Sequence, residues 1–178
     1  DDLNCDYYGS SLHKWLATPL GAGLLYVKRD HISKIWPLLA DHEKNIQNIR
    51  RLSHTGTHPV ATDLAIIDAI EYLNWIGIER KEKRMQFLKT YWQTALKDVP
   101  KILINTPFES YRSCGIGNVG LTNMSPSELS ERLYNEYQVF TVAIDYSNVK
   151  GCRITPNIFT SIRELDHFIG AMKKLAEA

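Results

Sequence analysis

Residues 6–15 read Asp6-Tyr7-Tyr8-Gly9-Ser10-Ser11-Leu12-His13-Lys14-Trp15, and a glycine-rich apolar run, Gly21-Ala22-Gly23-Leu24-Leu25-Tyr26-Val27, follows them. The apolar and aromatic residues at the two ends of this stretch predict short strands at Cys5–Tyr8 and Gly23–Val27. Small, hydroxyl-bearing and turn-forming residues fill the middle, which is typical of a loop. A loop between two strands is a place where a ligand meets backbone and side-chain donors.

This loop carries a lysine beside two side chains that suit a phosphate. Trp15 and Leu16 follow Lys14, and we expect them to shield its amine from water and favour the neutral form that reacts with a carbonyl. Ser11 and His13 are suitable hydrogen-bond donors for a phosphate. On these residues alone, an exposed loop lysine without a catalytic role is the commoner explanation, since most lysines are exposed.

The middle of the chain predicts a pair of helices. Residues 40–57 show no clear period and are expected to be mostly irregular. Helical apolar spacing predicts helices over 64–73 and 79–96, with Gly77 as the stop between them. The charges at 79–84 have mixed signs, so we interpret them as a solvated face.

From Lys101 onwards the pattern is that of a small α+β unit. Ser125 and Ser161 each open a capping box, which predicts one helix to Tyr137 and a second at the end of the chain. Short apolar runs predict strands at 102–104, 114–121, 139–144 and 152–155.

The lysine segment resembles the cofactor-lysine segment of class V aminotransferases. The branch it most resembles is the isopenicillin N epimerase-like group, whose relatives include cysteine desulfurases and selenocysteine lyases. The shared pattern is an acidic residue, aromatic residues, a serine, His-Lys and a glycine-punctuated strand. The resemblance implies that pyridoxal 5'-phosphate (PLP) is the cofactor, that Lys14 forms the Schiff base and that Ser11 and His13 bind the phosphate.

Two later segments resemble further elements of the same family. Thr55-Gly56-Thr57 resembles its Gly-Thr element, in which the threonine reaches the phosphate of the partner subunit's cofactor, so Thr57 implies a homodimer. Helix capping is a compatible role for this threonine. The run Gly151-Cys152-Arg153-Ile154-Thr155-Pro156 resembles the carboxylate-binding segment. Arg153 would then hold the carboxylate of an amino acid-like substrate as a bidentate fork, although a surface ion pair is the alternative.

The resemblance also implies the fold class and the domain organisation. The expected class is α/β, as the C-terminal half of a PLP fold type I enzyme. The expected parts are residues 1–57 as the end of the large-domain sheet, 58–100 as linking helices and 101–178 as a small α+β domain. The first half of such enzymes supplies an aspartate to the pyridine nitrogen and an aromatic residue that stacks on the ring. The match starts after these residues, so we expect this fragment alone to be inactive.

The sequence limits the possible reaction types only in part. Epimerisation, transamination and elimination at Cα all remain open, with Lys14 as the natural base. Cysteine desulfurases use a nucleophilic cysteine on a loop upstream of the carboxylate arginine, and 140–150 contains none. A persulfide mechanism is therefore disfavoured.

Composition excludes several other function classes. A net charge of +1 over 178 residues gives no electrostatic case for nucleic acid or an anionic membrane, and no apolar run is long enough to span a bilayer. The three cysteines are too few for a disulfide framework, which favours the cytoplasm. We expect no metal site, because Gly56 and Pro59 argue against a helix that would pair His54 with His58.

Two other readings compete with the enzyme. One is a non-catalytic dimerisation or interaction module in which the lysine motif is vestigial. A weaker one is a nucleotide-binding fragment that uses Gly21-Ala22-Gly23, which lacks the third glycine and the following helix of such sites.

Overall fold

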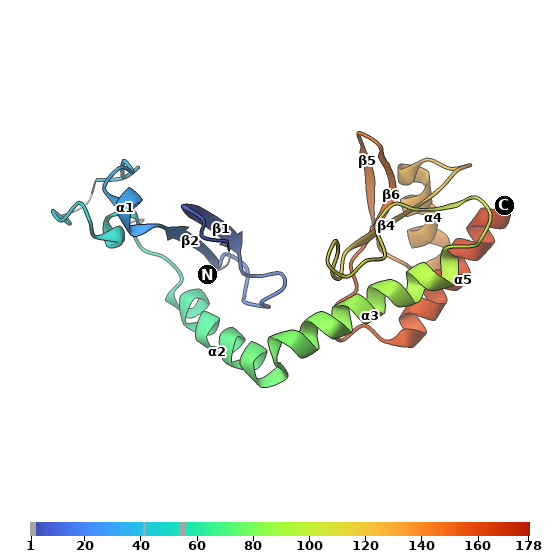
Figure 1. The fold of residues 1–178 in the computed structure, drawn as a ribbon, viewed down its shortest axis with the longest axis horizontal. Coiled ribbons are helices and arrows are strands. Elements are labelled where there is room, and N and C mark those ends of the chain that lie inside the picture. The colour runs from blue at the N-terminus through green and yellow to red at the C-terminus, as the bar shows by residue number, and fades with distance from the viewer. Residues whose placement is uncertain (1–2, 41, 54–55) are drawn as a thin grey trace. The chain divides into compact units, whose positions relative to one another are not determined.

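The computed structural model describes residues 3–40, 42–53 and 56–178, and the chain divides between Ile76 and Gly77 into an N-terminal unit and a C-terminal unit (Figure 1). Gly77 separates the last helix of one unit from the first helix of the other. Its φ of 86° lies in the left-handed region that glycine adopts without a steric penalty. The predicted stop at Gly77 is therefore present.

The N-terminal unit is built on an antiparallel hairpin. Strands β1 (Tyr7–Ser11) and β2 (Gly23–Val27) pair with Tyr7 opposite Val27 and Ser11 opposite Gly23. β1 therefore begins later than the predicted strand and includes Ser11, because its pairing continues to the edge of the loop. The unit continues with α1 (Arg29–Ile32), a short 3-10 helix η1 (Ile49–Leu52) and α2 (Val60–Ile76).

A buried arginine connects two of these elements. The guanidinium of Arg51 in η1 donates through Nη2 to the carbonyl oxygens of Ile32, at 2.9 Å, and Ile35. These carbonyls lie at and after the end of α1, where helical backbone acceptors lack intrahelical partners. Part of the segment predicted to be irregular is thus an ordered turn that is fixed to α1.

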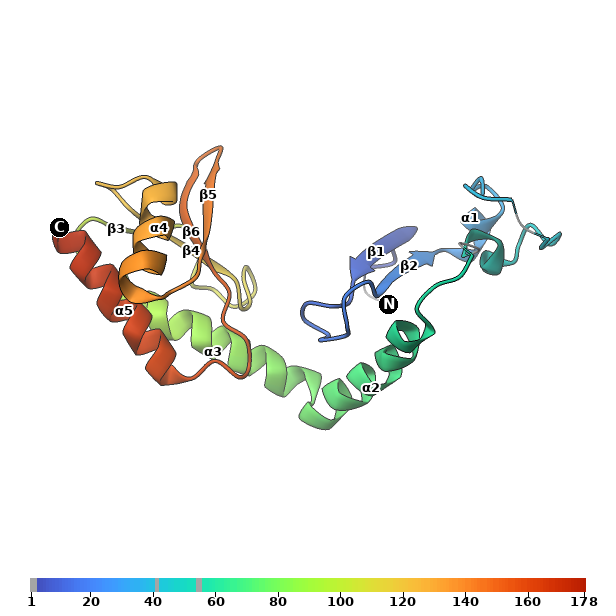
Figure 2. The same cartoon turned by 180° about the vertical axis from the view of Figure 1, so that it is seen from behind.

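The C-terminal unit places its helices on one face of an antiparallel sheet. In chain order its elements are α3 (Ile78–Leu96), β3 (Ile102–Ile104), β4 (Gly117–Leu121), α4 (Pro126–Tyr137), β5 (Val142–Tyr146), β6 (Val149–Ile154) and α5 (Ile162–Glu177). The strand order is β3-β4-β6-β5. Figures 1 and 2 show α3 beside α5, with α4 alongside β5 and β6. Both predicted capping serines begin their helices, and Ser161 forms the full capping box with Glu164.

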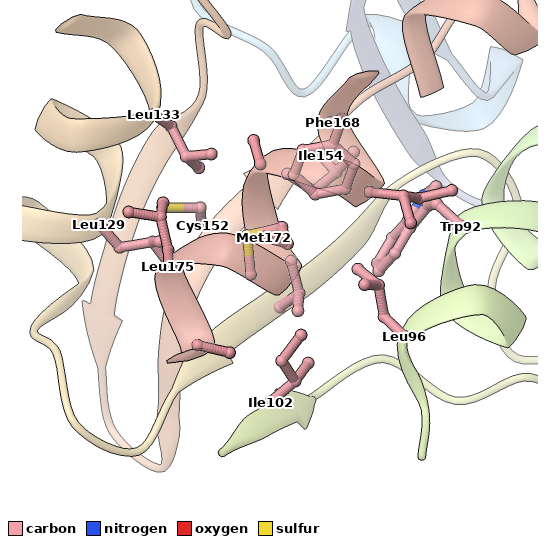
Figure 3. Packing of buried hydrophobic residues seen from close by; sticks show 14 of the residues in the cluster. Trp92, Leu96, Ile102, Leu129, Leu133, Cys152, Ile154, Phe168, Met172 and Leu175 are labelled. Carbon is pink, nitrogen blue, oxygen red and sulfur yellow. The ribbon is translucent and has the colours of Figure 1, made fainter. Parts of the chain in front are cut away.

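One hydrophobic core joins these helices to the sheet (Figure 3). Trp92 of α3 is fully buried and meets Phe168 of α5 edge to face, with ring centroids 5.9 Å apart. On the sheet side, Val119 and Cys152 are opposite one another and fully buried. Such dense packing tolerates little change in volume.

The strands differ from their predicted limits for identifiable reasons. β4 begins at Gly117, after the predicted start at 114. The residue after α4, Gln138, is left-handed with φ 57°, so β5 begins only at Val142. β6 is longer than predicted because it pairs with β5 from Val149 onwards. Turn geometry and strand pairing decide these limits, and neither is visible in hydrophobic patterning.

A buried lysine holds the loop between β3 and β4. Lys89 of α3 is fully buried, and its Nζ donates to the carbonyl oxygens of Pro107, at 3.1 Å, and Phe108, at 3.3 Å, and to the hydroxyl of Ser113. One turn further on, Gln93 donates to the carbonyl of Thr106 at 2.9 Å. Burial lowers the pKa of the Lys89 ammonium. Two polar side chains on the apolar face of α3 therefore hold the β3–β4 loop at Thr106, Pro107, Phe108 and Ser113.

Two glycines provide a matched test of the packing. A Cβ on Gly117 would lie 2.4 Å from Cζ2 of Trp92, whereas one on Gly170 in α5 would meet nothing within 4 Å. We predict that Gly117→Ala lowers the free energy of unfolding by about 1–3 kcal/mol through overpacking. Gly170→Ala should raise it by about 0.5–1 kcal/mol, because alanine loses less backbone entropy in a helix. Urea denaturation followed by circular dichroism measures both, and effects of the same sign would contradict the packing.

The lowered pKa of Lys89 predicts a pH dependence of stability. Between its folded pKa and the unfolded value of about 10.4, the unfolded chain binds more protons, so raising the pH favours the folded state. Wild type should therefore gain stability relative to Lys89→Met as the pH rises through that window. Lys83, exposed on the same helix, is the control. The test compares the free energy of unfolding of wild type with that of each variant as a function of pH. If the loss caused by Lys89→Met changes with pH no more than the loss caused by Lys83→Met, the Lys89 ammonium is not desolvated.

Candidate functional site

The loop between β1 and β2 folds back on its own base. Leu12 donates its backbone N–H to the carbonyl of Ala22 at 3.0 Å, which continues the hairpin pairing. Thr18 donates to the carbonyl of Leu12 at 3.4 Å, and Ala17 takes a left-handed φ of 65°. Leu12, Thr18 and Ala22 are buried. These contacts form a small fixed base from which residues 13–17 project as a turn.

The three predicted cofactor residues lie together at this turn. Ser11 ends β1 and is exposed, His13 is half-buried and Lys14 is exposed. The Nδ1 atom of His13 is buried and has no hydrogen-bond partner among the described residues. Neither the Ser11 hydroxyl nor the Lys14 amine has a hydrogen bond or ion pair within that part of the chain. The Ser11 hydroxyl, the Nδ1 atom of His13 and the Lys14 amine are therefore not paired within the described residues.

The expected shielding of Lys14 does not hold in this structure. Lys14 is exposed, and the neighbouring Trp15 is itself 36% exposed. Adjacent residues in a turn point in different directions, so an apolar neighbour in the sequence does not cover the amine. Any shielding has to come from groups that pack on the loop from elsewhere.

The acidic residue of the motif has a positioning role at the base of the hairpin. Asp6 accepts from Nε2 of His31 at 3.1 Å and lies 3.6 Å from Nζ of Lys28. Its backbone carbonyl also accepts from the N–H of Lys28 at 2.8 Å. The hydrogen bond from His31 lowers the pKa of the Asp6 carboxyl. Asp6 thus closes the hairpin end opposite to the lysine turn.

Thr57 lies in the approach to α2. It is exposed and follows Gly56, whose φ is 81°. In the described segments its side chain makes no hydrogen bond, and His58 pairs with Asp63 in the first turn of α2 at 3.1 Å. Thr55, the first residue of the predicted Gly-Thr element, lies outside the described residues.

Arg153 lies in the C-terminal unit, apart in the chain from the other four predicted residues. It is on β6, opposite Asn118 of β4 and Val142 of β5. Its neighbours Cys152 and Ile154 point into the core, so Arg153 projects from the opposite, helix-free face. Its guanidinium is exposed and has no ion pair among the described residues. The surface ion pair considered as an alternative is therefore absent from that part of the chain.

The cysteines do not form a reactive centre on this face. Cys152 is fully buried, which raises the pKa of its thiol. Cys114 is exposed, and partial desolvation of its sulfur raises its pKa as well. β5 and β6 are joined by a two-residue turn, Ser147 and Asn148, so the connection has no room for a mobile cysteine loop. A raised thiol pKa lowers the share of reactive thiolate.

Two site types receive no support from the described residues. No group of three or more histidine, cysteine, aspartate or glutamate side chains is arranged there to hold a metal ion, and His54 lies outside those residues. Within the same ranges, no helix is both long and apolar enough to cross a membrane.

Solved structures share this fold over nearly the whole chain. The apo cysteine desulfurase of Thermococcus onnurineus NA1 matches with a TM-score of 0.82 at 18% identity, covering 98% of this chain and 48% of that one. The cysteine desulfurase CsdA of Escherichia coli matches with a TM-score of 0.81 at 22% identity, covering 99% and 47%. A C-DES variant with glycine covalently linked to its PLP cofactor matches with a TM-score of 0.80 at 16% identity, covering 97% and 46%. The chain therefore has the α/β fold of these PLP fold type I structures.

Similar sequences give the same picture. Isopenicillin N epimerase of Streptomyces clavuligerus is 24% identical over 97% of this chain and 48% of its own length. A probable cysteine desulfurase of Staphylococcus aureus strain N315 is 23% identical over 99% of this chain and 46% of its own. The chain thus spans about half the length of the relatives it matches. The model of the family "Aminotransferase class-V" matches residues 1–143, which include Lys14 and Thr57 but not Arg153. The chain belongs to the class V aminotransferase family.

Proposed function

We propose that this chain supplies the cofactor lysine and the substrate-carboxylate arginine of a PLP-dependent enzyme that acts on an amino acid at Cα. The main observation behind this proposal is the turn at 11–14. Ser11, His13 and Lys14 lie on this one fixed loop, and the Ser11 hydroxyl, the His13 Nδ1 atom and the Lys14 amine have no hydrogen-bond partner among the described residues. Membership of the class V aminotransferase family and the PLP named for the C-DES structure support it.

The side chains of this loop fit the needs of the cofactor. A phosphate dianion needs hydrogen-bond donors, and the Ser11 hydroxyl and the His13 ring are available on the loop that also carries the lysine. Lys14 would hold the cofactor covalently through its amine. When bound, PLP supplies an electron sink for the charge that develops at Cα. Neighbouring groups on one fixed base are held in a constant geometry, which favours reaction.

Arg153 and Lys14 would divide the work on the substrate. A guanidinium fork binds a carboxylate with two parallel hydrogen bonds, so Arg153 would fix the common part of any α-amino acid. Once displaced by substrate, the Lys14 amine would be the base that takes the Cα proton. A persulfide mechanism remains disfavoured, because the two-residue β5–β6 turn carries no cysteine. Epimerisation, transamination and elimination without a nucleophilic thiol remain the candidate reactions.

A complete site would need more than this chain. The chain spans about half of its relatives' length, and α2 exposes large apolar side chains, among them Leu64 at 61%, Ile67 at 58% and Trp75 at 83%. Exposed apolar surface of this kind is typical of an interface. We propose that a homodimer covers part of it, with Thr57 directed to the partner subunit's cofactor, and that the chain alone is inactive.

The same apolar surface of α2 favours the second candidate, a non-catalytic interaction module with a vestigial lysine motif. Both candidates predict association through the N-terminal unit. They differ in chemistry, since only the enzyme requires that Lys14 reacts with a carbonyl compound.

Trapping the lysine separates the two candidates. We predict that borohydride reduction with PLP labels Lys14 in preference to the other lysines, as read by peptide mass spectrometry. Lys14→Ala should abolish the specific label, whereas Lys44→Ala, which removes an exposed lysine of the same unit, should leave it unchanged. The reaction should be run on this chain and on the longest natural protein that contains it.

Each outcome has a distinct meaning. Label on Lys14 in both proteins, or in the longer one alone, supports the enzyme, and the second pattern shows that residues beyond this chain complete the site. Labelling spread evenly over the surface lysines of both proteins would contradict it and favour the interaction module.

A further inference from the structure

An asparagine lies beside Arg153 on the open face of the sheet. Asn118 of β4 is the direct cross-strand partner of Arg153, so the two side chains emerge from the same face about 5 Å apart at Cβ. Asn118 is only 8% exposed, whereas Arg153 is exposed. Asparagine is disfavoured in strands, and its buried amide has to be hydrogen-bonded. The contacts of this side chain therefore need an explanation.

The surrounding network fixes the orientation of the amide. Asn105 donates from one nitrogen, Nδ2, to the carbonyl of Lys150 at 2.8 Å and to the Asn118 side chain at 2.7 Å. The Lys150 carbonyl can only accept, so the Asn105 atom is its nitrogen and the Asn118 atom facing it is the oxygen Oδ1. The Asn118 amide nitrogen is consequently the atom left over, and it has no acceptor in the described residues.

The backbone around Asn118 is also fixed. Its N–H donates to Oγ1 of Thr106 at 2.8 Å, and its carbonyl accepts from the N–H of Asn105 at 3.0 Å. A Cβ on Gly151 of β6 would lie 2.6 Å from Oδ1 of Asn118, so glycine is needed there for the amide to lie across the strand. A group that is held this closely without using its donors is suited to bind a ligand.

The chemistry of the pair points to an anion. A guanidinium has donors only. The Asn118 oxygen accepts from Asn105 and makes no hydrogen bond with Arg153 among the described residues, so the groups of this pair that remain unpaired are N–H donors. Two neighbouring donor groups cannot satisfy one another, but one carboxylate has enough lone pairs for both. No acidic side chain of the described residues is paired with either of them.

We propose that Asn118 is a second substrate-binding residue, which donates through Nδ2 to the same substrate carboxylate that Arg153 binds. This inference rests on the proposed function, because it takes the carboxylate role of Arg153 as given. Asn118 fixes the rotation of the carboxylate about its bond to Cα, and Asn105 positions Asn118. The pair therefore selects α-amino acids with a free carboxylate over their amides.

Nuclear magnetic resonance of the full chain tests both residues separately. The probe is L-alanine, and L-alaninamide, which lacks the carboxylate, is the matched control. We expect L-alanine to shift the Arg153 Nε–H and Asn118 Nδ2–H signals with one common Kd, while L-alaninamide shifts neither. Asn118→Asp keeps the shape and the acceptor for Asn105 but replaces the donor with a negative charge. This variant should raise the Kd for L-alanine at least about tenfold, because it loses a hydrogen bond to a charged group.

A control variant and the pattern of shifted signals distinguish the role of Asn118 from that of Arg153. Asn123→Asp makes the same charge change at an exposed position after β4 and should leave the Kd within about twofold, the size of a screened surface effect. Arg153 signals that move while Asn118 signals stay still would overturn the inference and leave the Arg153 assignment standing. Equal Kd values for wild type and a folded Asn118→Asp would do the same. If neither set of signals moves, the carboxylate role of Arg153 fails, and the inference fails with it.

Discussion

The alternation of side chains along β6 determines what the C-terminal unit can offer to a ligand. Cys152 and Ile154 pack into the core under α4 and α5, so the residue between them has to project from the face that carries no helix. Trp92 and Phe168 fill the covered side so densely that the strand cannot slip by one residue without burying a guanidinium. A single-sided core thus fixes Arg153, and Asn118 beside it, on an open surface.

The N-terminal unit also holds its candidate site residues in place, but with much less buried surface. Asp6 closes one end of the hairpin, and the pairing of Leu12 with Ala22 closes the other, so the turn with His13 and Lys14 is held by hydrogen bonds rather than by a large core. Its lysine stays exposed as a result. Shielding of this lysine would have to come from groups outside the turn, and the chain spans about half the length of the relatives it matches.

Sequence patterning predicted the four long helices, α2 to α5, and their order with the strands, because capping serines and apolar spacing are local signals. It did not predict the short helices α1 and η1. It predicted all four strands of the small unit, with β3 at its observed limits and β4 at its observed end. It missed the limits of β5 and β6, which depend on the left-handed Gln138 and on the β5–β6 register. The sequence pattern did not predict the roles of Lys89 and Asn118. Lys89 lies at an apolar helix position, which was the available signal, but its acceptors are in a loop that only the tertiary structure brings to it.

We propose that one loop holds both the cofactor lysine and the phosphate donors, and phosphorus NMR of bound PLP is the measurement that distinguishes their roles. We expect Lys14→Ala to abolish covalent retention of PLP but to keep the bound phosphorus signal, because Ser11 and His13 remain. Replacing both of those residues with alanine should shift that signal towards free PLP while Lys14 can still be reduced onto the cofactor. A phosphorus signal that is the same in wild type and in the Ser11→Ala/His13→Ala variant would show that these two side chains do not bind the phosphate.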